Sequence, residues 1–316
     1  MKFSKKECLT QKPLFKYLLI LSIGLSPFFN ALSQEVEPRR WSSIPLGFNA
    51  VGAGYVYTEG DVFFDPLLGV EDATYKGSTF VGSYIRPFKL WNKLARVDVL
   101  IPFASAKWEG LLNGVPASVQ RTGFKDPRVR FSLNLTGPPP TGPKELQEYR
   151  MKNPVFTTFG VSLAITFPFG EYFNDKLINL GDNRFVFRPQ AGMVHYWGPW
   201  SFELTSSVLF YTNNNDFLNG LTQEKNPMFA AQTHLIRQLG KKYWASVSAG
   251  YNQGASSTVN LQSNNDQRAN FLAAFSFGFS FAGTQGLKAA YVLSDTQRDA
   301  GSTTNSLLIS WSILFK

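Results

Sequence analysis

The sequence predicts an all-β fold: a single antiparallel transmembrane β-barrel of about 12 strands, of the outer-membrane type. Three observations predict it. Long segments alternate apolar residues with small or polar ones, an export signal occupies the N-terminus, and long polar connections alternate with short ones along the chain. The first predicts the strands, the second predicts the cellular compartment, and the third predicts the up-and-down topology.

The chain begins with a basic stretch, then an apolar run, then small residues. Five lysines lie within the first 16 positions, Leu18–Leu25 is apolar, and Ala31 and Ser33 supply the small residues of a cleavage site. This is the order of a secretory signal peptide. As a helix, the apolar run is too short to span about 30 Å of hydrocarbon. The start of the chain therefore predicts export and a location in the cell outer membrane.

Three regions follow from this assignment. We predict a signal peptide over 1–33, an N-terminal periplasmic segment over 34–46, and the barrel over 47–316. Cleavage removes five lysines and one glutamate, so the formal net charge falls from +9 to +5. Much of the basic balance therefore belongs to the targeting signal, and export makes nucleic acid an improbable partner.

Composition excludes several classes of site. The one cysteine, Cys8, lies in the predicted signal peptide, so the mature chain has neither a disulfide nor a cysteine metal site. Two histidines are too few for a histidine-rich metal centre, and no glycine motif for phosphate is present. We therefore expect no cofactor and no metal. The expected partners are the lipid bilayer and a small-molecule solute.

Period-2 alternation is clearest in residues 155–170. Seven of the eight odd positions, from Val155 to Phe169, are apolar, whereas the even positions are mostly small or polar. Residues 269–281 and 307–315 show the same pattern. These segments exceed the five or six residues of ordinary strands and suit a transmembrane strand, which needs about 9–11 residues. The apolar face is expected to meet lipid and the polar face to line the lumen.

Twelve segments of this kind are found, an even number as single-chain barrels require. They are about 47–59, 78–88, 94–106, 125–136, 154–170, 184–196, 200–211, 227–238, 242–253, 268–281, 286–294 and 303–315. Long polar connections, expected outside the cell, are 60–77, 107–124, 171–183, 212–226, 254–267 and 295–302. The connection 137–153 is long but falls on the side of the short turns, so we interpret it as a periplasmic excursion.

The alternation also assigns charged and polar side chains to the lumen. The candidates that line it are Arg96, Asp98, Arg128, Arg130, Arg188, Gln190, Glu203 and His234, and Arg86 is a further member of the set. Five arginines thus face two carboxylates. Two interpretations remain open. One is a network of ion pairs and hydrogen bonds that braces the wall, since buried charges are normally paired. The other is a basic constriction that selects anionic or hydrogen-bond-accepting solutes.

Several stretches also resemble a known family. They are Phe124-Lys125-Asp126-Pro127-Arg128, Leu177-Ile178-Asn179-Leu180-Gly181, Asn183-Arg184-Phe185, Phe187-Arg188-Pro189-Gln190, Glu203-Leu204-Thr205, Tyr211-Thr212-Asn213-Asn214, Gln232-Thr233-His234-Leu235 and Gly250-Tyr251-Asn252. Together they are similar to the MetA-pathway of phenol degradation family of outer-membrane barrels, over about 120–316. The resemblance implies an outer-membrane transporter for aromatic or small hydrophobic compounds and carries over no catalytic residue.

Two other classes of function compete with a channel, an enzyme and a barrel without transport. An outer-membrane phospholipase needs a serine beside a histidine on the lipid-facing wall, and neither His195 nor His234 provides that pair. A barrel protease needs acidic residues with a histidine at the outer rim, and Asp175, Asp182 and Asp216 have none nearby in sequence. A structural or surface-interaction barrel without transport is the main alternative, with the loops 212–226 and 254–267 as its working part.

Overall fold

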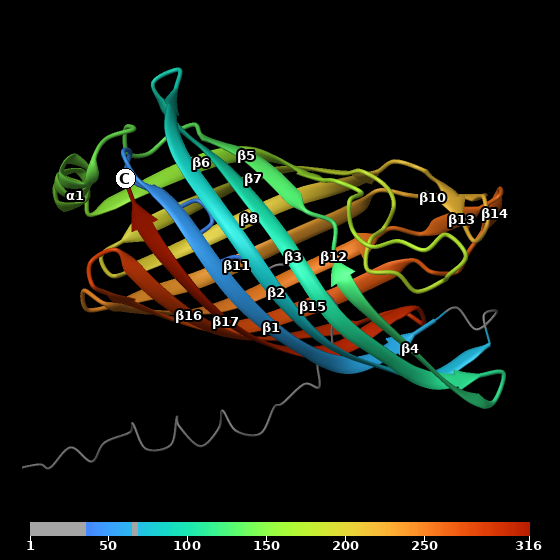
Figure 1. Cartoon of the computed structure of the whole chain (residues 1–316). Coiled ribbons are helices and arrows are strands. Elements are labelled where there is room, and N and C mark those ends of the chain that lie inside the picture. The colour runs from blue at the N-terminus through green and yellow to red at the C-terminus, as the bar shows by residue number, and fades with distance from the viewer. Residues whose placement is uncertain (1–35, 65–68) are drawn as a thin grey trace, which may run out of the picture.

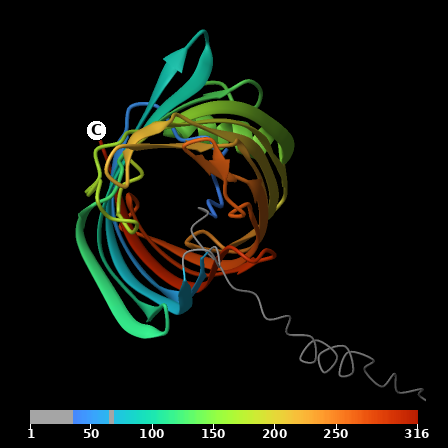
Figure 2. The ribbon, with the colours of Figure 1, turned by 90° about the vertical axis from the view of Figure 1, so that its right-hand side faces the viewer.

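The computed structural model describes residues 36–64 and 69–316. The predicted signal peptide, 1–33, lies outside the described residues. Twelve antiparallel strands close into a barrel, which confirms the predicted fold class (Figures 1 and 2). They are β1 (Asn49–Phe63), β2 (Val70–Leu90), β3 (Lys93–Leu112), β5 (Arg128–Asn134), β6 (Val155–Thr166), β7 (Val186–Trp197), β8 (Trp200–Tyr211), β11 (Met228–Leu239), β12 (Tyr243–Gly254), β15 (Arg268–Phe281), β16 (Gln285–Thr296) and β17 (Gly301–Phe315).

The barrel closes by pairing its first strand with its last. Strand β1 pairs with β17 from Asn49↔Phe315 to Phe63↔Gly301, and on its other edge with β2. Strand β2 then pairs with β3 along nearly its whole length. Because the backbone groups of each strand are satisfied by its neighbours, the sheet can sit in hydrocarbon, where unpaired polar groups are costly.

The two faces of the wall differ as the alternation predicts. On β15, Phe277 is 39% exposed on the outer face, while the adjacent Ser276 is 1% exposed. Leu163 and Ser162 on β6 show the same contrast. The apolar side chains therefore form the surface that meets lipid, and the small polar ones face the lumen.

The fourth strand position is divided in two. Strand β4 (Val115–Phe124) pairs with the outer half of β3, and β5 pairs with the inner half of β3 and with β6. The break falls at 125–127, where Pro127 has no N–H to donate. The loop 167–185 bonds to the edge of β4, with Glu171 N donating to Phe124 O at 2.7 Å and Arg121 Nε donating to Ile178 O at 3.1 Å.

The two ends of the barrel are unlike. Helix α1 (Pro143–Lys152) lies in the connection 137–153, at the end that carries the short turns (Figure 1). The opposite end carries a small sheet of β9 (Asn214–Phe217), β10 (Leu221–Lys225), β13 (Ser257–Val259) and β14 (Gln262–Ser263). Among the described residues, no helix is both long and apolar enough to cross a membrane.

Five strands arise in stretches that the sequence assigned to loops. They are β4, within 107–124, and the four short strands of the small sheet, within 212–226 and 254–267. The short strands have two to five residues and carry mostly polar side chains, so they lack the apolar face that makes a membrane strand recognisable. Strands β1 and β2 also extend into the predicted loop 60–77.

Candidate functional site

The N-terminal segment enters the barrel and fills part of its lumen, as the blue chain inside the ring of strands in Figure 2 shows. We call residues 36–46 the plug. They are the described part of the segment 34–46 that the sequence predicts to precede the barrel. The backbone N–H of Arg40 donates to Glu203 Oε2 at 3.0 Å, and the Trp41 indole N–H donates to Thr205 Oγ1 at 2.7 Å. The plug lies inside because its polar groups find partners on the polar face of the wall.

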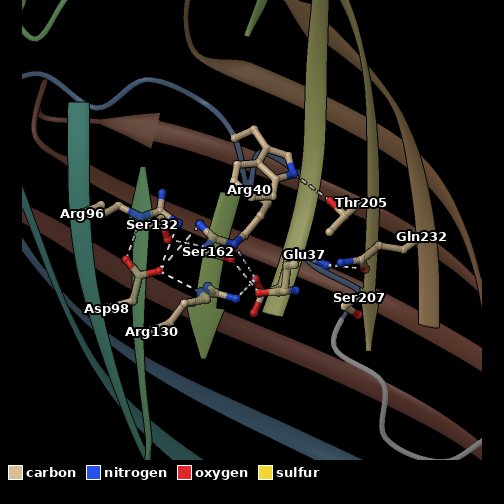
Figure 3. Close-up of polar contacts among 12 residues, drawn as sticks. Glu37, Arg40, Arg96, Asp98, Arg130, Ser132, Ser162, Thr205, Ser207 and Gln232 are labelled. Atoms are coloured by element: carbon tan, nitrogen blue, oxygen red, sulfur yellow. Dashed lines mark hydrogen bonds and ion pairs between the residues drawn. The ribbon is translucent and has the colours of Figure 1, made fainter. Parts of the chain in front are cut away.

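Asp98 is the centre of the charge cluster between plug and wall (Figure 3). Its carboxylate lies 2.7 Å from Arg96 Nε, 3.0 Å from Arg130 Nε and 3.7 Å from Arg40 Nη1. The Asp98 residue is 8% exposed. A carboxylate removed from water in this way needs paired cations, and it has three.

Glu37 of the plug is the second carboxylate of the cluster. It lies 2.7 Å from Arg130 Nη1, 3.3 Å from Arg128 Nη2 and 3.7 Å from Arg40 Nε. Arg40 also donates from Nη2 to Ser132 Oγ at 2.6 Å. Four of the eight predicted lumen residues, namely Arg96, Asp98, Arg128 and Arg130, are therefore brought together by the plug.

The remaining predicted lumen residues lie farther around the wall. Register places Glu203 directly opposite His234 across β8 and β11, and both are completely buried. His234 Nδ1 is 2.8 Å from Ser248 Oγ. Gln190 Oε1 accepts a hydrogen bond from Ser162 Oγ at 3.1 Å, and Arg188 Nε donates to Ser207 Oγ at 3.1 Å. Of these four, Glu203 joins the plug through the Arg40 N–H.

Arg86 is the one candidate that the strand register moves out of the lumen. It lies opposite Val97, which in turn lies opposite Phe131. Phe131 belongs to the exposed apolar surface, and directly opposed residues share a face. Arg86 therefore faces outward, and the expectation that it points into the lumen is wrong. Strand β2 has apolar residues at both odd and even positions, such as Val81 and Phe80. The alternation in this strand therefore does not show which side chains point into the lumen.

Trp41 occupies a socket built from three adjacent strands. Gly160 on β6 lies opposite Gly192 on β7, and Gly192 lies opposite Thr205 on β8. A Cβ on Gly160 would lie 2.4 Å from the Trp41 ring, and one on Gly192 would lie 2.3 Å from its indole nitrogen. Only glycine allows the ring to approach the backbone so closely. The Trp41 residue is 1% exposed.

The end of the plug is held by the connection that carries α1. Leu46 N donates to Thr141 O at 2.8 Å, and Arg150 Nη2 donates to Ser43 O at 3.2 Å. Tyr196 on β7 adds a hydrogen bond from its hydroxyl to Ser42 Oγ at 3.0 Å. The excursion 137–153 thus contacts the segment through which the plug joins β1.

One of the motifs that carry the family resemblance, residues 124–128, lies at the break in the fourth strand and contacts the loop that contains two others. Asp126 Oδ1 accepts a hydrogen bond from Gly170 N, and Oδ2 accepts one from Asp182 N, both at 2.8 Å. Asp182 also lies 3.9 Å from Lys225 Nζ, whose positive charge lowers the pKa of the Asp182 carboxyl. These contacts fix the loop 167–185 against the edge of β4.

Sequence reasoning missed the plug residues and the socket. Glu37, Arg40 and Trp41 lie in a short stretch with no periodicity, so no strand or helix pattern singles them out. One signal was present. Four inward arginines, Arg96, Arg128, Arg130 and Arg188, against the two carboxylates Asp98 and Glu203 left positive charge to be matched, and Glu37 supplies a third carboxylate. The part of the chain that the structure describes holds no group of three or more His, Cys, Asp or Glu able to bind a metal.

The comparisons with known proteins agree with this architecture. The family model described as "Putative MetA-pathway of phenol degradation" matches residues 50–307, and the chain belongs to that family. A COG4313 outer-membrane channel from Pseudomonas putida F1 is similar in structure, with a TM-score of 0.71 and 16% identity over 89% of this chain and 100% of that one. The transport unit of the autotransporter AIDA-I from Escherichia coli has a TM-score of 0.51 and 8% identity over 89% and 93%. No curated protein matches in sequence.

Proposed function

We propose that the protein is an outer-membrane channel that takes up aromatic or other small hydrophobic compounds, and that the plug closes its lumen at rest. The observation that carries this proposal is that residues 36–46, which belong to no strand of the wall, lie inside the lumen and contact its polar face. A wall braced for its own stability would need no separate segment inside it. Membership of a family named for phenol degradation and similarity to an outer-membrane channel support the same function.

The contacts of the plug suit a closure that can be undone. Within the lumen they are ion pairs and single hydrogen bonds to side chains that water or a solute can replace, such as Glu203, Ser132 and Thr205, whereas Leu46 N, at the end of the plug, bonds to the backbone of Thr141. The plug includes no strand of the barrel sheet, so it can leave without breaking a ladder of backbone hydrogen bonds. Opening therefore leaves the wall intact.

The charge of the lumen favours anions. Arg96, Arg128 and Arg130 cluster on one side of it, and two carboxylates, Asp98 and Glu37, lie among them. When the plug withdraws it takes both Glu37 and Arg40 with it, and Asp98 is then the one carboxylate among the three wall arginines of the cluster. An open lumen is thus basic on this side and attracts aromatic acids by electrostatic focusing.

Uptake by proteoliposomes tests the proposed function. We expect the variant Glu37→Gln/Arg40→Gln/Trp41→Ala, in which the plug has lost the side chains that hold it in the lumen, to accelerate benzoate entry above both the intact chain and protein-free vesicles, and to leave sucrose entry at the protein-free rate. Benzoate is a better probe than a neutral aromatic compound, because its charge slows its passage through the lipid itself. Equal benzoate rates with and without protein would contradict transport and would favour the structural barrel.

Arg130→Ala should shift ion selectivity toward cations. Arg130 pairs with both Asp98 and Glu37, so removing its guanidinium makes the cluster less positive. Reversal potentials in planar bilayers under a salt gradient measure the shift. Arg237→Ala is the matched control, since the Arg237 guanidinium lies 4.9 Å from the Trp200 ring on the outer face of the wall. A shift of the same size in both variants would contradict the lumenal role of Arg130.

A further inference from the structure

We propose that the Trp41 socket is a binding subsite for a planar aromatic solute with a hydrogen-bond donor, such as an indole or a phenol. In the closed state the plug fills the subsite with its own indole. The proposal rests on the proposed function, because it concerns a solute that enters the same lumen, and it names the chemical class that the wall recognises. Gly160, Gly192 and Thr205 form the subsite.

The floor of the socket is shaped for a flat ring. Gly160 and Gly192 are paired across β6 and β7, so two residues without Cβ atoms lie side by side on the inner face of the wall. The atoms that a Cβ on Gly160 would approach most closely are Trp41 Cε3 and Cζ3, at 2.4 and 2.5 Å. The ring therefore lies directly on bare backbone, where any larger wall residue would displace it.

The edge of the socket recognises a donor. Thr205 Oγ1 accepts the indole N–H at 2.7 Å, and Thr205 is 1% exposed. A buried hydroxyl that loses its partner is penalised, so withdrawal of Trp41 leaves a group that favours another N–H or O–H in its place. Glu203, two residues earlier on the same inward face of β8, is also an acceptor and accepts the N–H of Arg40 in the closed state.

The polarity of the socket contrasts with that of the arginine cluster. The inward groups of β8 at this level are a hydroxyl and a carboxylate, Thr205 and Glu203, whereas the side of the lumen formed by β3 and β5 carries arginines. A neutral ring with an N–H or O–H suits the first surface, and a carboxylate suits the second. The subsite therefore selects indoles and phenols over the corresponding ring acids.

Equilibrium binding of indole, measured by isothermal titration, tests the proposal without any need for flux. Trp41→Ala empties the socket, and we expect it to bind indole about tenfold more tightly than the intact chain, in which Trp41 competes. Adding Gly160→Ala to Trp41→Ala should weaken indole binding about tenfold, because the new methyl occupies the ring's place. The variant should fold, since with Trp41 gone the nearest remaining atom is Asn134 Oδ1 at 3.3 Å.

Two comparisons separate the subsite from general loosening of the lumen. Gly250→Ala in the Trp41→Ala background is the control, because its methyl meets ordinary contacts at 3.5 Å, and indole binding should not change. Thr205→Val in the same background should weaken indole about tenfold and leave 1-methylindole, which has no N–H, unaffected. Thermal melting of each variant checks that the barrel is intact.

The outcomes distinguish this proposal from the proposed function. If Trp41→Ala binds indole no better than the intact chain, or if Gly160→Ala and Gly250→Ala have equal effects, the subsite is overturned, whatever the benzoate uptake. If indole binds as expected but no solute enters proteoliposomes, the subsite stands and the channel function falls.

Discussion

Asp98→Ala should lower the free energy of unfolding by about 3–5 kcal/mol, because it leaves buried guanidinium groups without their carboxylate. Asp98 lies within 4 Å of Arg40, Arg96 and Arg130, so the loss falls on three cations at once. Urea-induced unfolding in lipid vesicles, followed by tryptophan fluorescence, measures the change. Glu109→Ala is the control, since its ion pair with Lys107 is half exposed and such pairs contribute about 0–1 kcal/mol.

The stability of the same variant tests whether the arginine cluster braces the barrel. If Asp98→Ala is as stable as the unmodified chain, the cluster does not brace the barrel, and the view of Asp98 as its structural centre is contradicted.

Phe277→Arg should cost about 2–4 kcal/mol, the price of an arginine on the lipid face near the bilayer midplane. Phe277 is 39% exposed on the outer surface of β15. Leu163→Arg on β6, at 41% exposure, should behave alike. Ser276→Asn on the lumen face is the matched polar substitution and should cost much less. Equal losses on both faces, measured by folding into bilayers, would contradict the assignment of the inner and outer faces of the wall.

The strands that cross the membrane could be predicted because hydrocarbon imposes one rule on all of them. Every second residue must be apolar, so segments such as 200–211 and 268–281 coincide with β8 and β15 residue for residue. Strand β4 does not follow that alternation, so it was not predicted. Its sequence mixes Val115 and Val119 with polar residues, and one of its edges is bonded by a loop rather than by a strand.

The candidate site could be predicted in part. Parity places Asp98 and Arg130 in the lumen without any knowledge of pairing, because both lie in strands with a clean apolar face. The contacts of the plug depend on where an aperiodic segment folds back, which no local pattern specifies. Gly160 and Gly192 illustrate the difficulty. In sequence they weaken two strands, and their role is visible only when Trp41 lies between them and the lumen.

Single-channel conductance tests most directly whether the plug closes the lumen. The comparison is between the intact chain and Glu37→Gln/Arg40→Gln/Trp41→Ala, which removes the two plug charges of the cluster and the ring in the socket. All three side chains belong to the plug, so the wall is unchanged. We expect a low conductance for the intact chain and a severalfold higher one for the triple variant. Equal conductance in the two would contradict closure by the plug.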